Sequence, residues 1–165
     1  MTVEEVGSQI EKILLDFQIG DLKKAAGPFL KAIGLMTATE FLGGLVTGTL
    51  GLRGPRTSRH RFEEGLGQLG PAYEELLTTP GAIDLYENIR CGLVHQYLPL
   101  MTQAVLSGET KGPGIVDCTG RLELRVDDYI RDLEKAAKRL ICNLADDPVL
   151  FRNCVRSLQK APRIA

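Results

Sequence analysis

The sequence predicts an all-α protein, an antiparallel bundle of about five to six helices with a small β-hairpin inserted near residues 104–126. Apolar residues recur at intervals of three and four along most of the chain, which is typical of amphipathic helices. This pattern breaks once, where apolar and charged residues alternate as in a strand. With 165 residues, the chain predicts a single domain, 1–165, that buries a core without disulfides or metal.

The N-terminal part predicts two helices. The first carries an apolar stripe and is expected to end at Gly20. Its stripe consists of Val3, Val6, Ile10, Ile13 and Phe17. Pro28 suits the first turn of the second helix, and Gly48 and Gly51 are expected to loosen its end. Its buried face is expected to comprise Phe29, Ile33, Met36, Phe41 and Leu45.

Residues 53–61 read Arg-Gly-Pro-Arg-Thr-Ser-Arg-His-Arg, which predicts a strongly charged loop. Ser58 is the expected N-cap of a third helix that carries Phe62, Leu66 and Leu69. Gly70-Pro71 breaks this helix, and a short helical piece follows. After the turn at Pro80-Gly81, a fourth helix is expected over residues 82–97.

Residues 121–126 alternate between charged and apolar side chains, which indicates a strand. Thr119-Gly120 is expected to turn this strand back toward Ile115-Val116 and so to form the hairpin. Asp127 or Asp128 then begins a fifth helix. Its apolar face consists of Ile130, Leu133, Ala137, Leu140 and Leu144. Pro148 opens a last short helix.

Composition narrows the class of protein. Apolar residues make up 44% and charged residues 25%, and the formal net charge is −1, so anion binding has to be local. The four cysteines lie far apart and match neither disulfide nor zinc-finger spacing, which favours reduced thiols, a cytoplasmic location, and no metal or cofactor. The uncharged run at residues 41–52 is too short for a bilayer, so no membrane association is expected.

Residues 90–97, Arg-Cys-Gly-Leu-Val-His-Gln-Tyr, carry the strongest chemical signal. His95 is a side chain that titrates near neutral pH, and Arg90 supplies a fixed positive charge suited to a phosphate. On an α-helix, however, the two residues lie about 140° apart around the axis, whereas Arg90 and Tyr97 lie about 20° apart. Arg90 and His95 are therefore not expected to converge within one helix, although two copies meeting across a two-fold axis would share a cleft.

Arg90-x4-His95 resembles the Arg-x(4–6)-His motif of the HEPN superfamily, whose members are all-α domains of about this length. Many members are metal-independent endoribonucleases in toxin or antiviral defence systems, with sites at a homodimer interface. Tyr97 extends the match to a form that is similar to HEPN toxins encoded beside minimal nucleotidyltransferase antitoxins, which add AMP to that Tyr. Cys91 departs from the pattern, since catalytic members usually have a polar residue directly after the Arg.

The resemblance implies RNA cleavage in which Arg90, His95 and Tyr97 form the site, His95 moves a proton and Arg90 stabilises charge on the phosphate. It implies a homodimer, RNA as substrate, and an antitoxin or nucleotidyltransferase as partner. The alternative is a non-catalytic HEPN-like module that binds a nucleotide, RNA or protein. A third interpretation is an unrelated bundle, in which Arg90 pairs with a carboxylate and His95 caps a helix end.

Other residues have two interpretations each. Arg53, Arg56, Arg59 and Arg61 either grip RNA phosphates or form a solvated surface balanced by nearby glutamates. Glu40 either faces solvent or faces the core, where it needs a partner such as Arg90. The glycines at 43, 44 and 48 indicate either a close helix contact, expected at a dimer interface, or a loose helix end.

Overall fold

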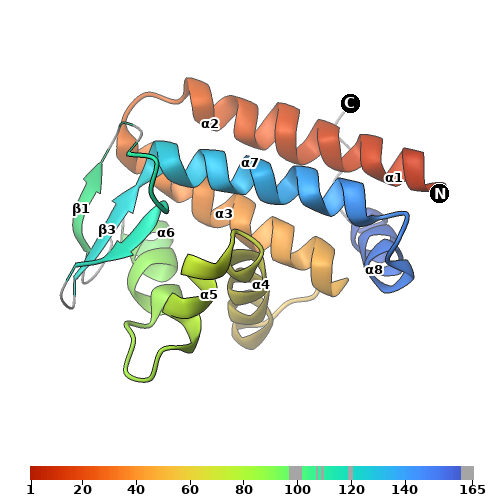
Figure 1. Ribbon diagram of the computed structural model, residues 1–165. Helices are drawn as coiled ribbons and strands as arrows, with labels where there is room; N and C mark the ends of the chain where they lie inside the picture. The colour runs from red at the N-terminus through yellow and green to blue at the C-terminus, as the bar shows by residue number, and fades with distance from the viewer. Residues whose placement is uncertain (97–101, 107, 109, 119–120, 161–165) are drawn as a thin grey trace.

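The computed structural model describes residues 1–96, 102–106, 108, 110–118 and 121–160. The predicted helical bundle with an inserted antiparallel hairpin is confirmed. Figure 1 shows a long N-terminal helical rod and α7 (Val126–Asn143) running side by side, with α3 (Pro28–Thr47) crossing beneath them and α4 (Pro55–Gly67) below α3. Beyond the ends of these helices lie a small sheet on one side and α8 (Pro148–Leu158) on the other.

The N-terminal rod is longer than predicted. It consists of α1 (Val3–Ile10), the π-helical segment η1 (Glu11–Ile19) and α2 (Gly20–Lys24). Gly20 does not end the helix, because its φ of −58° and ψ of −42° are helical. Ile19 and Leu22 on either side of it are buried, and this packing outweighs the roughly 1 kcal/mol that a helical glycine costs.

Helix α3 is the centre of the bundle and packs against the rod, α4, α7 and α8. Pro28 opens it, as predicted, and Gly48 ends it in the left-handed conformation at φ 72°. By length and composition alone, α3 is long and apolar enough to span a membrane. The uncharged run at residues 41–52 did not predict this, because the run is too short for a bilayer. Half of its apolar window is buried inside the fold, as expected for a core helix.

Glycines bring α3 and α4 into close contact. A Cβ added at Gly43 would lie 1.7 Å from the Arg61 carbonyl oxygen, and one at Gly65 would lie 2.0 Å from the Thr39 carbonyl oxygen. The close helix contact expected at Gly43 therefore exists, but inside one chain rather than between two. It sets the distance between the faces of α3 and α4 that carry the candidate site.

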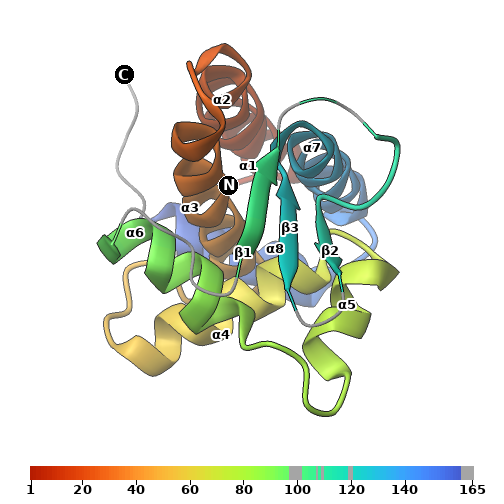
Figure 2. The same cartoon turned by 90° about the vertical axis from the view of Figure 1, so that its left-hand side faces the viewer.

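The inserted sheet has one more strand than predicted. The expected hairpin is present: β2 (Ile115–Asp117) pairs antiparallel with β3 (Leu122–Arg125). The proposed turn residues Thr119-Gly120 lie outside the described residues. β1 (Thr102–Leu106) adds to the other edge of β3 in parallel, which gives the order β1-β3-β2. In Figure 2 the sheet faces the viewer, with α6 (Gly92–Gln96) on one side and α5 (Pro71–Thr78) on the other.

The last two helices begin close to where the sequence predicts. Asp127 and Asp128 lie in the first turn of α7. Pro148 opens α8, and the Asp147 side chain caps it by accepting from the N–H groups of Val149 and Leu150. One continuous core joins the helices to β2 and β3, with Phe62, Tyr73 and Tyr129 among its largest fully buried side chains.

Candidate functional site

Arg90 and His95 lie next to each other, although an α-helix would have separated them. Arg90 belongs to a π-helical segment, η2 (Tyr86–Cys91), and His95 to α6, which follows it directly. A π-turn bonds residue i to residue i+5, so it brings residues five apart onto one face. Arg90 Nη1 lies 3.5 Å from His95 Nε2, so the prediction that the two do not converge within one helix is wrong.

The local sequence supports this turn at both ends. The Asp84 carboxylate accepts a hydrogen bond from the Glu87 N–H at 3.1 Å, and the Asp84 carbonyl accepts one from Asn88 Nδ2 at 2.8 Å. At the other end, the Gly92 N–H donates to the Glu87 carbonyl five residues earlier. Gly92 is buried, so a larger residue at this position would need additional space. The segment begins near Leu85, a few residues later than expected.

Glu40 on α3 holds Arg90 in place. Its Oε2 accepts from Arg90 Nη2 at 2.7 Å and from Nε at 3.1 Å, while its Oε1 accepts from Arg61 Nη2 at 2.7 Å and from the Ser58 hydroxyl at 2.6 Å. Of the two interpretations of Glu40, the one in which it faces inward with Arg90 as its partner is thus confirmed, and Arg61 is a second cation on the same carboxylate. Because Nε and Nη2 of Arg90 are bound to Glu40, Nη1 is the nitrogen left facing His95.

Burial and neighbouring charges shift the pKa values of Glu40 and Arg90 in opposite directions. Burial alone would raise the pKa of Glu40, but hydrogen bonds from Ser58, Arg61 and Arg90 outweigh it and lower that pKa below its usual value. For Arg90, burial would lower the pKa, while the bonds and charge of Glu40 raise it. The side chains of Glu40 and Arg90 are 13% and 16% exposed, whereas His95 is exposed. A fixed charge thus stands beside a proton carrier that solvent reaches.

The Tyr86 ring orders a second arginine beside Arg90. The guanidinium carbons of Arg59 and Arg90 lie 4.7 Å and 5.4 Å from the ring centroid, within cation–π range. Arg59 also bonds both carboxylate oxygens of Asp84, at 2.9 and 2.8 Å, and Glu87 at 2.9 Å. These contacts tie α4 to η2 and fix the segment that carries Arg90.

The charged segment at 53–61 is mostly helix rather than loop. Helix α4 begins at Pro55 with Gly54 as its N-cap, so the prediction that Ser58 caps the helix is wrong. Pro55 at the first position has a φ already suited to a helix. The Ser58 hydroxyl donates to Glu40 instead of capping the backbone.

The four arginines of this segment fall into two pairs. Arg59 and Arg61 are bound to carboxylates, Arg59 to Asp84 and Glu87 and Arg61 to Glu40. Arg53 and Arg56 are exposed and have no carboxylate partner in the part of the chain that the structure describes. Arg53 and Arg56 can therefore bind a phosphate directly, whereas Arg59 and Arg61 would first have to break an ion pair.

The other predicted features are placed as follows. Tyr97 lies outside the described residues. Cys91 is partly buried and packs against the core, and Cys91, Cys142 and Cys154 form no disulfide within the described residues. No group of three or more His, Cys, Asp or Glu side chains within the described ranges is arranged to hold a metal ion.

The arrangement at Arg90 suits a phosphate group. A phosphate oxygen placed between Arg90 Nη1 and His95 Nε2 would contact a permanent cation and a titratable nitrogen at once. Arg61, Arg90 and Glu40 together leave one positive charge, and Arg59 with Asp84 and Glu87 beside them leaves one negative charge. The attraction for an anion therefore comes from the nearby guanidinium of Arg90 and not from the net charge of the cluster. The geometry therefore permits both binding of a phosphodiester and proton transfer to it.

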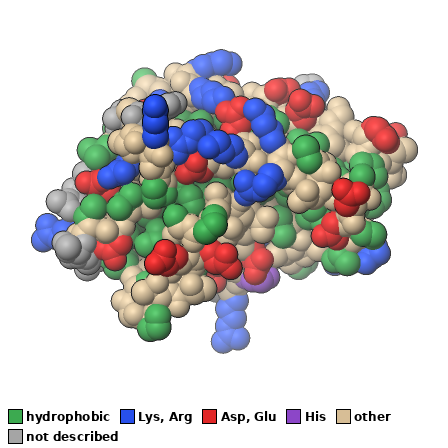
Figure 3. All heavy atoms as spheres, viewed as in Figure 1, with side chains coloured by type: hydrophobic (Ala, Val, Ile, Leu, Met, Phe, Trp, Pro, Cys, Tyr) green, Lys and Arg blue, Asp and Glu red, His purple; other side chains and the backbone are tan. Residues whose placement is uncertain are grey.

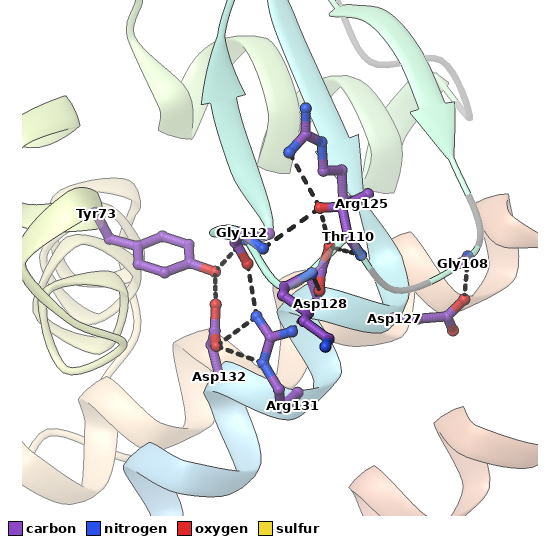
Figure 4. A network of polar contacts seen from close by, with 11 residues as sticks. Tyr73, Gly108, Thr110, Gly112, Arg125, Asp127, Asp128, Arg131 and Asp132 are labelled. Carbon is purple, nitrogen blue, oxygen red and sulfur yellow. Dashed lines mark hydrogen bonds and ion pairs between the residues drawn. The ribbon is translucent and has the colours of Figure 1, made fainter.

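Sequence reasoning missed a second polar cluster, around Asp128 on α7 (Figure 4). Asp128 is completely buried and accepts hydrogen bonds from Arg131 and from Thr110, whose N–H and hydroxyl lie at 2.9 and 2.7 Å. Tyr73 joins the cluster by donating to Asp132 at 2.7 Å and accepting from the Gly114 N–H at 2.7 Å. The residues that meet here lie up to 59 positions apart, so no local motif announces the cluster.

Comparison of the chain with known proteins found no matching family model, no similar curated protein and no similar solved structure.

Proposed function

We propose that this chain is a HEPN-like domain that cleaves RNA without a metal ion, with Arg90 and His95 at its catalytic site. The observation that carries the proposal is the contact between Arg90 Nη1 and His95 Nε2 at 3.5 Å, in which Glu40 holds the other side of the guanidinium. A prearranged cation beside an exposed proton carrier is what phosphodiester cleavage requires.

In the proposed reaction the 2′-oxygen of a ribose attacks the adjacent phosphorus. A P–O2′ bond forms, the P–O5′ bond breaks, and the products end in a 2′,3′-cyclic phosphate and a 5′-hydroxyl. His95 exchanges a proton with the 2′-hydroxyl or with the leaving 5′-oxygen, and Arg90 stabilises the negative charge on the non-bridging oxygens. A positioned general acid or base contributes about 10²- to 10⁴-fold to such a rate.

The proposal includes a homodimer in which two such pairs face one cleft. Val94 and His95 on α6 are exposed, Val94 by 39%, so this face of α6 is open to a second copy. A two-fold axis here would place two histidines near one RNA strand, one for each proton transfer. The proposed setting is a cytoplasmic toxin or defence system with an antitoxin or nucleotidyltransferase as partner.

The rival candidate is a non-catalytic module that binds RNA or a nucleotide at the same place. Its support is the ion pair itself: Glu40 already compensates Arg90, which weakens the field available to a transition state. Such a module would bind a phosphodiester and leave it intact.

The test is incubation of the full-length protein with RNA in excess EDTA, followed by analysis of the product ends. The proposal predicts cleavage with 2′,3′-cyclic phosphate ends, which 2′-deoxy substitution at the cleaved nucleotide abolishes and Arg90→Ala reduces by at least about a hundredfold. Binding of RNA without cleavage would favour the rival module. Activity that needs an added metal ion would contradict the proposal.

A further inference from the structure

A pocket of about 460 Å³ opens between α5, α7 and the chain that leads into β2. One part of its wall is apolar and consists of Leu69, Pro71, Ala72 and Pro113. The other part carries the basic side chains Lys111, Arg131 and Lys135, with Asp132 as the acidic one. The pocket lies away from Arg90: Figure 2 shows α5 and α6 on opposite sides of the sheet.

Two of these cations are free to bind an anion. Lys111 and Lys135 are exposed, and neither has a carboxylate partner among the residues that the structure describes. Arg131 is instead engaged by Asp128 and by Asp132, at 3.0 Å from the latter. Asp132 would repel an anion, but its oxygens are already bound by Arg131 and by the Tyr73 hydroxyl.

Lys111 is held at the pocket in a costly backbone conformation. Its φ of 63° makes it the one residue other than glycine with a positive φ in the described part of the chain. Asp128 fixes this conformation, because its Oδ1 accepts from the Lys111 N–H at 3.2 Å and its Oδ2 accepts from Thr110. Arg131 adds a bond to the Gly112 carbonyl at 2.6 Å (Figure 4). Strain maintained by a buried network is often found at binding sites.

The neighbouring pocket on the other side of α7 differs in charge. It measures about 430 Å³ and contains Lys23 and Lys31, but these pair with Glu134 and Asp127 at 2.5 and 2.8 Å. In Figure 3 Lys and Arg side chains gather over the region of α7, while Asp and Glu side chains gather along the lower edge. Lys111 and Lys135, which have no carboxylate partner among the described residues, thus distinguish the first pocket from this one.

We propose that this pocket binds a small phosphate monoester with an apolar body. Lys111 and Lys135 would bind the phosphate oxygens, Arg131 would hold the floor rigid, and the wall of Leu69, Pro71 and Pro113 would cover the apolar part. A monoester fits better than an internal phosphodiester of RNA, because two free lysines match its two negative charges. The volume also suits a compact ligand rather than a polymer.

The test is calorimetric titration of the full-length protein with phenyl phosphate at low ionic strength, with inorganic phosphate for comparison. The proposal predicts saturable binding, several-fold tighter for phenyl phosphate because its ring is buried. Lys135→Gln and Lys111→Gly should each weaken binding about tenfold. Lys111→Gly should unfold at the same temperature as the parent or above it, because glycine adopts a positive φ without strain.

The matched control is Lys138→Gln, which makes the same change on the same helix outside the pocket, at a side chain that is 61% exposed. It should change the affinity less than twofold, and His95→Ala should leave it unchanged. Absence of saturable binding at millimolar phenyl phosphate would overturn the proposal. An equal loss in Lys138→Gln, or binding of RNA without terminal phosphates where phenyl phosphate fails, would also overturn it. None of these three results tests cleavage at Arg90 and His95.

Discussion

Replacement of Glu40 by Gln removes the charge that joins α3, α4 and η2. The amide oxygen of the new side chain still accepts from Ser58 and Arg61, but its NH2 group faces Arg90 as donor against donor. Removing one partner of a buried ion pair typically costs about 3–5 kcal/mol. Because Arg90 can turn toward solvent, we expect the lower end, about 3 kcal/mol, which for a chain of this size lowers Tm by about 6–12 °C.

The assay is chemical unfolding of the parent and Glu40→Gln at several pH values. The matched control is Glu64→Gln on α4, an exposed carboxylate that lies 3.8 Å from His60 Nδ1. Glu40→Gln should lose about 3 kcal/mol more than the control at neutral pH. A difference below about 1 kcal/mol would refute the reasoning, since that is the range of a surface pair.

The pH dependence of this loss has a definite sign. The pKa of Glu40 is lowered in the folded protein, so its ionic contribution is complete above the usual carboxyl pKa of about 4.3 and is lost as the pH falls through the lowered value. The gap in unfolding free energy between the parent and Glu40→Gln should therefore narrow in acid. A gap that is constant or grows on acidification would contradict the assignment.

Three further predictions concern the fold. Gly43→Ala should destabilise the protein by at least about 3 kcal/mol in chemical unfolding, because its Cβ would overlap the Arg61 carbonyl. Asp128→Asn should increase amide hydrogen exchange at residues 110–112 and weaken the pH dependence of stability below about pH 4, since Arg131 and Thr110 outweigh burial and lower the Asp128 pKa. Burial raises the pKa of Cys154 to about 12, so at neutral pH iodoacetamide should modify the exposed Cys142 and leave Cys154 intact until unfolding.

Each of these three predictions would be contradicted by a specific result. A Gly43→Ala protein as stable as the parent would show that α3 and α4 separate easily. Unchanged exchange in Asp128→Asn would show that the buried carboxylate does not hold the chain ahead of β2. Modification of Cys154 in the native protein at the rate of Cys142 would show that the packing of α8 against α3 does not shield it.

The sequence predicts those elements of the fold that depend on local chemistry. The apolar period of α7 and the prolines that open α3 and α8 are local signals, and the structure confirms them. The need of Glu40 for a partner also follows from its apolar neighbours. The parallel pairing of β1 with β3 was not predictable in this way, because a pairing between distant segments leaves no local pattern.

The candidate site was only partly predictable for a similar reason. The residues Arg90 and His95 can be selected by their chemistry, but their contact depends on the π-helical segment η2 and on its packing against α3 and α4. A spacing of five residues is the one sequence signal for it, and an α-helical interpretation treats that spacing as evidence against contact. The pocket at Lys111 depends on Asp128, whose partners come from a separate segment.

The most direct test of the central claim compares the two histidines of the chain. Cleavage of RNA in EDTA is measured for His95→Ala and for His60→Ala, which removes the other histidine, also exposed. The claim that Arg90 and His95 form the catalytic pair predicts a loss of at least about a hundredfold in His95→Ala and a rate within twofold of the parent in His60→Ala. Equal rates for the two variants would contradict it.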